Sequence, residues 1–326
     1  MLAFLRDSIM ISATLMLLAL VPVVAAQSPG DGVRRSKYAR KEVDASELDR
    51  KLAEIRRLKE KNSQEAVGEL SEIIKVETIE QVQLSAVMAL ADMRKHPTAA
   101  ASALLKVLDR GPATLHGAAS AALVILGRPA EPAVLNFLAD GKRKNRADVV
   151  WVLNSFGPKN LNILRALVDA LSDSEREVRE AAAHVLDNWG SRSEAASDAL
   201  EKGLNDSSAR VRIHAASALC QIDTDNLPAL AIIRCALEDT EGDNRYLALV
   251  CVSDWARPVA AERILPQIIR NLRDKDPAIR MTAAQVLRRI GAGAAVAIPT
   301  LRELVGREAD AQVKSEMIRA ISSLSE

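Results

Sequence analysis

The sequence has few aromatic residues, few cysteines and no excess of either charge. Only 2% of its 326 residues are aromatic, and three cysteines are too few for a disulfide framework. Lysine and arginine total 44 against 43 for aspartate and glutamate, and this balance argues against nucleic-acid binding through bulk positive charge. A disordered chain would be poorer in apolar residues, which make up 48% of this one. The abundance of alanine and leucine, with only 14 glycines, predicts a helical protein.

Residues 1–26 have the pattern of an export signal. Arg6 and Asp7 precede an uncharged stretch that is apolar at its centre, and Val24 and Ala26 occupy the −3 and −1 positions of a cleavage site. The stretch is also close to the roughly 17–25 residues of a membrane-spanning helix, so an uncleaved membrane anchor is the alternative. We therefore predict an exported protein, periplasmic or secreted, that contacts a membrane only if this segment stays attached.

A pattern of about 33 residues recurs along the rest of the chain. Each repeat contains an alanine-rich stretch such as REAAAHVLDNWG at residues 179–190, and a second apolar-periodic run follows, as at residues 161–171. Each repeat therefore predicts a first helix, a turn and a second helix. One such hairpin cannot bury its apolar stripe alone, whereas a stack of hairpins can. The alanine-rich stretches begin at Gln83, His116, Arg146, Arg179, Arg212, Arg245, Arg280 and Lys314.

These repeats predict an all-α protein of the α-solenoid class, a right-handed superhelix of stacked helix hairpins. We assign residues 62–326 to an array of about eight repeats. Residues 27–44 are predicted to be a flexible N-terminus and residues 45–61 a capping helix, with Leu48, Leu52, Ile55 and Leu58 on one side. The alternative for this basic segment is an arm that touches an anionic membrane or polymer.

An acid six positions before an arginine, an alanine-rich run and a following leucine together resemble the HEAT repeat, in particular the short HEAT-like type of phycobilisome lyases. The segment LRDKDPAIRMTAAQVLRRIG, residues 272–291, is the closest single match. The resemblance implies that acidic and basic side chains form a ladder that ties the repeats together. The ladder would comprise Asp140, Arg146, Asp173, Arg179, Asp206, Arg212, Asp239, Arg245, Asp274 and Arg280.

No motif in the sequence predicts a catalytic, cofactor or metal site. The four histidines lack zinc-like spacing, and no His-Glu dipeptide occurs of the kind carried by HEAT-like di-iron hydroxylases. There is no glycine-rich phosphate loop and no G-x-S-x-G motif. We expect packing roles for a further set of residues, and partial exposure for the thiol of Cys235. The set comprises His184, His214, Cys220, Cys251, Trp151, Trp189 and Trp255.

In related solenoids the second helices line the concave side, so exposed polar residues on those helices form a predicted partner-binding row. The row comprises Lys106, Asn136, Arg165, Asp169, Lys202, Arg234, Arg270 and Arg302. A mixed-charge row suits recognition of another protein. We therefore predict an exported, non-enzymatic scaffold that binds a protein and no nucleic acid. An enzyme or enzyme subunit of the HEAT-like lyase type is the alternative.

Overall fold

The computed structural model describes residues 44–255 and 259–325. Every regular element in these ranges is a helix, and none of the described residues forms a strand, which confirms the all-α class. The predicted export signal and residues 27–43 of the predicted flexible N-terminus lie outside the described residues. In the described ranges no single helix has the length and apolar composition to cross a membrane, although the bent pair 113–126 and 128–139 meets that criterion jointly.

The described chain divides into two compact units. The N-terminal unit holds residues 44–104 and 111–126, and the C-terminal unit holds residues 105–110 and 127–325. The helices of the N-terminal unit are α2 (Ala45–Lys61), α3 (Gln64–Val76), α4 (Glu80–Ala91) and α6 (His116–Leu126), while α5 (Pro97–Arg110) belongs partly to each unit. Within the N-terminal unit α4 packs against α2, α3 and α6.

Helix α2 occupies the segment for which the sequence predicts a capping helix. Its start is capped by Asp44, whose side chain accepts from Ser46 N at 3.0 Å. Ile55 and Leu58 are buried against the neighbouring helices, and Leu48 is half-buried. Burial of this apolar stripe joins α2 to α3 and α4.

The C-terminal unit continues as an alternation of first and second helices. The first helices, which contain the alanine-rich motif, are α8 (Arg146–Phe156), α10 (Arg176–Trp189), α12 (Ala209–Ile222), α14 (Gly242–Asp254), α17 (Pro277–Ile290) and α19 (Ala311–Leu324). The second helices are α7 (Glu131–Ala139), α9 (Leu161–Ala170), α11 (Ser197–Gly203), α13 (Leu227–Leu237), α16 (Leu265–Asn271) and α18 (Ile298–Val305). A short helix, α15 (Val259–Glu262), and the 3-10 segments Arg128–Ala130, Gly190–Ala196 and Gly291–Ala297 complete the connections.

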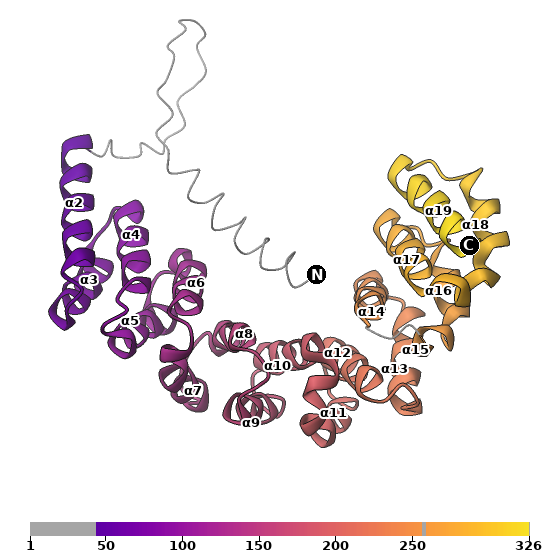
Figure 1. The fold of residues 1–326 in the computed structure, drawn as a ribbon, viewed down its shortest axis with the longest axis horizontal. Coiled ribbons are helices and arrows are strands. Elements are labelled where there is room, and N and C mark those ends of the chain that lie inside the picture. Colours follow the sequence, from indigo (N-terminus) through magenta and orange to yellow (C-terminus); the bar gives the residue numbers. More distant parts are fainter. Residues whose placement is uncertain (1–43, 256–258, 326) are drawn as a thin grey trace, which may run out of the picture. The chain divides into compact units, whose positions relative to one another are not determined.

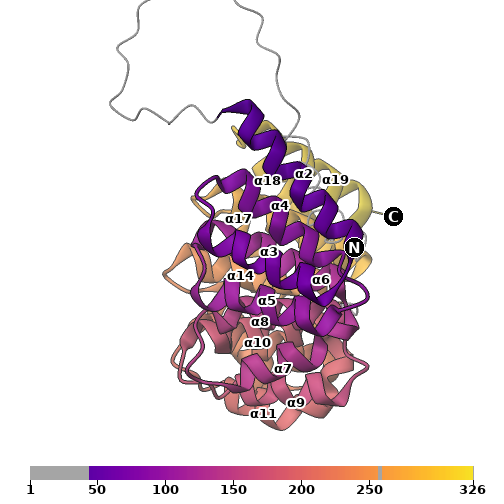
Figure 2. The same ribbon diagram turned by 90° about the vertical axis from the view of Figure 1, so that its left-hand side faces the viewer.

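The first helices of the C-terminal unit pack more closely against one another than the second helices do. Their contact faces carry small buried residues, including Ala182, Ala183, Ala215 and Ala284, which let the helix backbones approach. A stack whose layers lie closer together on one side bends toward that side. The first helices accordingly line the inner side of this unit's curve and the second helices its outer side (Figure 1), and α9 and α11 lie below α8 and α10 in the turned view as well (Figure 2).

This arrangement corrects the predicted concave row. Its residues from Asn136 to Arg302 lie on second helices and therefore on the outer, convex side of the C-terminal unit, while Lys106 lies on α5. All eight residues of the row are exposed, and Arg270 pairs with Glu238. The prediction took the side of the curve from related solenoids, whereas here the closely packed, alanine-rich first helices lie on the inner side.

Candidate functional site

An ion-pair ladder runs along the loops that lead into the first helices. The arginine near the start of one first helix pairs with the acid that precedes the next: Arg179 Nε donates to Asp206 at 2.7 Å, and Arg245 Nε donates to Asp274 at 2.7 Å. Arg179 and Arg245 each also donate to a carbonyl of their own repeat, as Arg179 Nη1 does to Asp173 O at 2.9 Å. One guanidinium thus joins two consecutive repeats. Arg280 with Glu308 forms a third rung of this kind, and Arg146 with Asp173 forms a rung in which the arginine donates to carboxylates alone.

Two expected ladder positions depart from this pattern. Asp140 accepts from Arg143 Nε at 2.9 Å, because the preceding repeat has no arginine at the start of its motif. Arg212 Nη1 donates to the carbonyl oxygen of Asp206 at 2.8 Å, and within the described residues no ion pair joins it to Asp239. The ladder is therefore interrupted between α12 and α14.

The ladder carboxylates stay ionised despite partial burial. Burial opposes the charge of Asp173, but the Arg146 guanidinium and the Glu175 N–H outweigh it and lower the pKa of Asp173. The pKa values of Asp206 and Asp274 are lowered in the same way, against burial, by Arg179 and Arg245.

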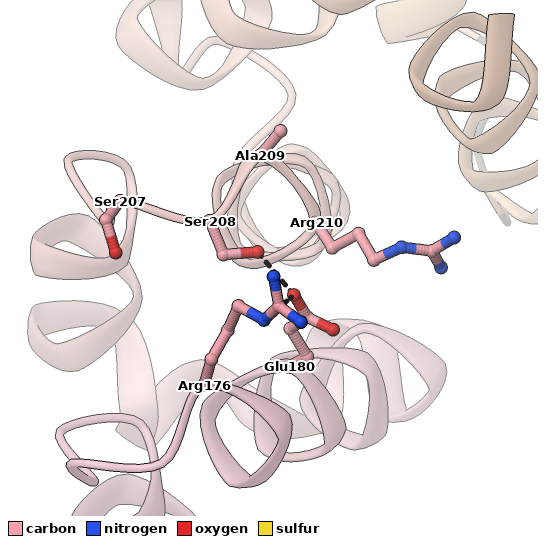
Figure 3. A pocket seen from close by; sticks show the side chains of 6 residues that line it. All are labelled: Arg176, Glu180, Ser207, Ser208, Ala209 and Arg210. Atoms are coloured by element: carbon pink, nitrogen blue, oxygen red, sulfur yellow. Dashed lines mark hydrogen bonds and ion pairs between the residues drawn. The ribbon is translucent and has the colours of Figure 1, made fainter. Parts of the chain in front are cut away.

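Two adjoining hollows lie on the inner side of the C-terminal unit. The smaller, of about 210 Å³, lies on α8, α10 and α12 and is lined by Ala147, Trp151, Glu177, Glu180, Ala181, His184, Arg210 and His214. The larger, of about 420 Å³, lies at the start of α12 and shares Glu180 and Arg210 with it (Figure 3). Ser208 Oγ donates to Glu180 Oε1 at 2.6 Å, and Arg176 Nε lies 3.7 Å from the same oxygen. Arg210 extends away from this pair (Figure 3).

A row of three rings leads from the smaller hollow into the core. Trp151 is 41% exposed and meets His184 edge-on, with the ring centroids 4.8 Å apart. His184 stacks on the buried ring of His214, with the centroids 4.2 Å apart. Burial and the neighbouring His214 lower the pKa of His184 to about 4, so its ring is neutral at pH 7 and the stack carries no charge repulsion.

Behind the ring row lies a buried polar cluster formed by three first helices. Asp187 of α10, His214 of α12 and Cys251 of α14 are 7%, 4% and 3% exposed. His214 Nδ1 lies 2.9 Å from Asp187 Oδ2, and Cys251 Sγ donates to the same oxygen at 3.5 Å. Gln221 Nε2 donates to Asp187 Oδ1 at 2.9 Å and to Asp187 O at 3.0 Å. Burial, followed by the nearby Asp187 carboxylate, raises the pKa of Cys251 well above its usual value, so this thiol stays protonated.

The residues expected to have packing roles differ in burial. His214, Cys220, Cys251, Trp189 and Trp255 are buried. Trp189 Nε1 donates to Asn154 Oδ1 at 3.1 Å and Trp255 Nε1 to Ser217 Oγ at 2.8 Å, so both indoles are satisfied inside the stack. In contrast, Trp151 and His184 line the hollow, and Cys235 is exposed.

Sequence reasoning missed both the hollow and the buried cluster. The cluster members are separated by 27 and 37 residues, close to one repeat length, so only the stacking of repeats brings their side chains together. No short motif signals such a site. The histidines at 184 and 214 are a usable signal, because both fall in alanine-rich stretches of consecutive repeats.

Residues 130–220 and 228–322, more than half of the chain, match the family described as HEAT repeats. The chain belongs to the HEAT-repeat family. Both matched segments fall in the C-terminal unit and cover all six of its first helices, except for the last two residues of α12 and of α19. No curated protein sequence matches the chain.

Solved structures resemble this HEAT-repeat chain in fold at low sequence identity. A chain in the structure of Kap95p with RanGDP has a TM-score of 0.59 at 12% identity, over 88% of this chain and 44% of that one. A chain in the structure of Kap121p bound to RanGTP has a TM-score of 0.56 at 15% identity, over 86% and 39%. The complex of CpcE and CpcF of phycocyanin lyase from Nostoc sp. PCC7120 gives a TM-score of 0.45 at 17% identity, over 80% and 94%. The first two place the fold among HEAT- and armadillo-type solenoids, and this chain spans less than half the length of either.

Proposed function

We propose that this HEAT-repeat protein is an exported, non-enzymatic scaffold that binds another protein on the inner side of its C-terminal unit. The observation that carries the proposal is Trp151, which is 41% exposed on a first helix at the edge of a hollow of about 210 Å³. Tryptophans beside concave surfaces are enriched among the residues that dominate the free energy of protein association. Solenoids of this kind use their extended concave faces for binding.

The surroundings of Trp151 suit a protein partner. Glu177, Glu180 and Arg210 line the same hollow and provide a polar rim of mixed charge. Two more first helices carry large exposed apolar side chains, Tyr246 at 44% and Ile318 at 47%. The structural neighbours support a protein partner over a nucleic acid, since the Kap95p and Kap121p structures are described as complexes with Ran, and the net charge here is only +1.

The test is a matched pair of substitutions read by quantitative mass spectrometry of proteins that co-purify from the cell envelope. Trp151→Ala removes the inner indole, and Leu227→Ala removes an outer apolar side chain that is 67% exposed at the start of α13. We expect Trp151→Ala to lose the partner at least tenfold and Leu227→Ala to keep it, because a buried hot-spot side chain contributes 2 kcal/mol or more to binding, a fold-change of roughly thirty. Equal partner recovery from both variants contradicts an inner binding face.

The same purification tests export and the non-enzymatic role. A chain that begins at Gln27 supports cleavage after Ala26, and an intact Met1 in the membrane fraction supports the anchored alternative. A stoichiometric chromophore or organic cofactor, seen as an absorbance band of the purified protein, would instead favour the lyase-type alternative.

A further inference from the structure

The buried cluster behind the ring row brings three different metal-ligand types to one point. Asp187, His214 and Cys251 come from three consecutive first helices, and each offers one ligand atom within 4.8 Å of the others. The atoms form a triangle with sides of 2.9 Å between His214 Nδ1 and Asp187 Oδ2, 3.5 Å between Cys251 Sγ and Asp187 Oδ2, and 3.7 Å between Cys251 Sγ and His214 Nδ1.

This triangle has almost the size of one face of a tetrahedral zinc site. Zinc binds sulfur at about 2.3 Å, imidazole nitrogen at about 2.0–2.1 Å and carboxylate oxygen at about 2.0–2.2 Å, so its ligand atoms lie roughly 3.3–3.6 Å from one another. Two sides of the triangle already match within about 0.1–0.2 Å, and the third needs to lengthen by about 0.4 Å. We propose that Asp187, His214 and Cys251 bind a zinc ion, with water in the fourth coordination position.

The surroundings supply the outer contacts that a zinc site needs. Gln221 Nε2 holds Asp187 through its Oδ1 and its carbonyl oxygen, which leaves Oδ2 facing His214 and Cys251. Hydrogen bonds of this kind orient a ligating carboxylate. Zinc would also supply positive charge next to a carboxylate that is only 7% exposed.

The protons balance on binding. The thiol of Cys251 releases its proton to solvent as the sulfur–zinc bond forms. His214 exchanges the Nδ1 contact with Asp187 for the metal and carries its proton on Nε2. Each zinc bound by the neutral-thiol form therefore releases one proton.

The smaller hollow provides the route for the ion. His214 belongs both to the cluster and to the lining of this hollow, and the His184 ring stacks on the His214 ring. The His184 ring is thus the side chain that stands between the hollow and His214 on this side. A zinc ion would enter from this hollow, because His214 is the cluster residue that lines it.

The experiment uses a full-chain Cys220→Ala, Cys235→Ser variant, in which Cys251 is the one remaining thiol. The reduced, chelator-treated protein is titrated with Co²⁺ and then with Zn²⁺. We expect a thiolate-to-cobalt charge-transfer band that saturates at one equivalent and is displaced by zinc, with release of one proton per zinc. Zinc should also raise Tm, because it binds the folded state alone.

Substitutions within this background separate a metal site from a hydrogen-bonded core cluster. Gln221→Ala, which touches no metal, should weaken zinc binding about 10–100-fold while the band keeps its energy. Asp187→Asn keeps the shape of the side chain and should weaken zinc binding further. Absence of the cobalt band and of the zinc-dependent Tm shift in the folded single-thiol protein overturns the proposal, and so does a band that persists unchanged when Cys251 is also replaced by Ala. Loss of partner binding by Trp151→Ala does not bear on either readout.

Discussion

Substitution of Asp173 by Ala tests whether the ladder contributes to the unfolding free energy. Asp173 is the bidentate partner of Arg146, whose side chain is only 3% exposed, and the Nη2–Oδ1 distance is 2.8 Å. Removal of the carboxylate leaves a buried guanidinium with one remaining carboxylate, Glu175, at 3.0 Å from Nη2. The Nε atom of Arg146 already lacks a hydrogen-bond partner, so the variant would leave a guanidinium with two nitrogens short of partners.

The expected loss is about 3 kcal/mol of unfolding free energy. Breaking a buried ion pair by removal of one partner typically costs about 3–5 kcal/mol, and the remaining Glu175 contact places this case at the low end. The matched control is Glu303→Ala, which removes an exposed carboxylate from Arg273 and Arg307. Such surface pairs contribute about 0–1 kcal/mol.

Urea unfolding followed by circular dichroism measures both losses on the full chain. The double variant Arg146→Met, Asp173→Ala should recover most of the loss, because it removes the uncompensated charge and keeps an apolar side chain of similar length. If Asp173→Ala costs no more than Glu303→Ala, or if the double variant is as unstable as the single one, the ladder argument is wrong.

Three further predictions follow from particular contacts. The pKa values of Asp173, Asp206 and Asp274 are lowered in the folded state, so these ionised carboxylates stabilise the fold fully above their unfolded pKa of about 3.9. This stabilisation is lost as the pH falls through the folded pKa values. An unfolding free energy that stays constant from about pH 5 to pH 2 would contradict this. Gly190→Ala should lower the unfolding free energy by about 1–3 kcal/mol, because Gly190 has φ of +56° and an added Cβ would lie 2.8 Å from Gln221 Oε1. Gly141→Ala, with open space around the added Cβ, is the control and should be nearly neutral in the same thermal unfolding assay. A thiol-reactive dye should label Cys235 alone in the native protein and all three cysteines after denaturation. Cys235 is exposed, whereas burial raises the pKa of Cys220 to about 12. Rapid labelling of two or three thiols in the native protein would show that the buried thiols of α12 or α14 become exposed readily.

Local sequence signals anticipated the elements well. The acid before these motifs holds the loop that leads into the helix: Asp206 Oδ1 accepts from Ser208 N at 2.7 Å, and Asp274 Oδ1 accepts from Asp276 N at 3.0 Å, in each case from the residue directly before the helix. Gly127, Gly157, Gly190 and Gly291 all have positive φ at the ends of first helices. These features depend on neighbours within a few residues, so composition and spacing are enough to find them.

Long-range placement was harder to infer. Trp151 sits in an alanine-rich stretch like Trp189 and Trp255, yet it is 41% exposed and the other two are 4% exposed. Trp151 lies five residues after the start of its stretch, whereas Trp189 and Trp255 lie ten residues after theirs, so it occupies a different helix position. The repeat pattern marks this difference, but only the packing of α8 on α10 decides that the position is exposed. The side of the curve was inferred wrongly for the same reason, since it depends on how closely the two sets of helices pack.

The sequence alone determined that the chain is a helical HEAT-repeat array, because a repeating apolar period and local capping residues act within one repeat. Only the tertiary structure decided which helices face inward and that Asp187, His214 and Cys251 meet. Both outcomes arise from the packing of one repeat on the next, where a distance of a few ångströms depends on side-chain volumes from three helices at once.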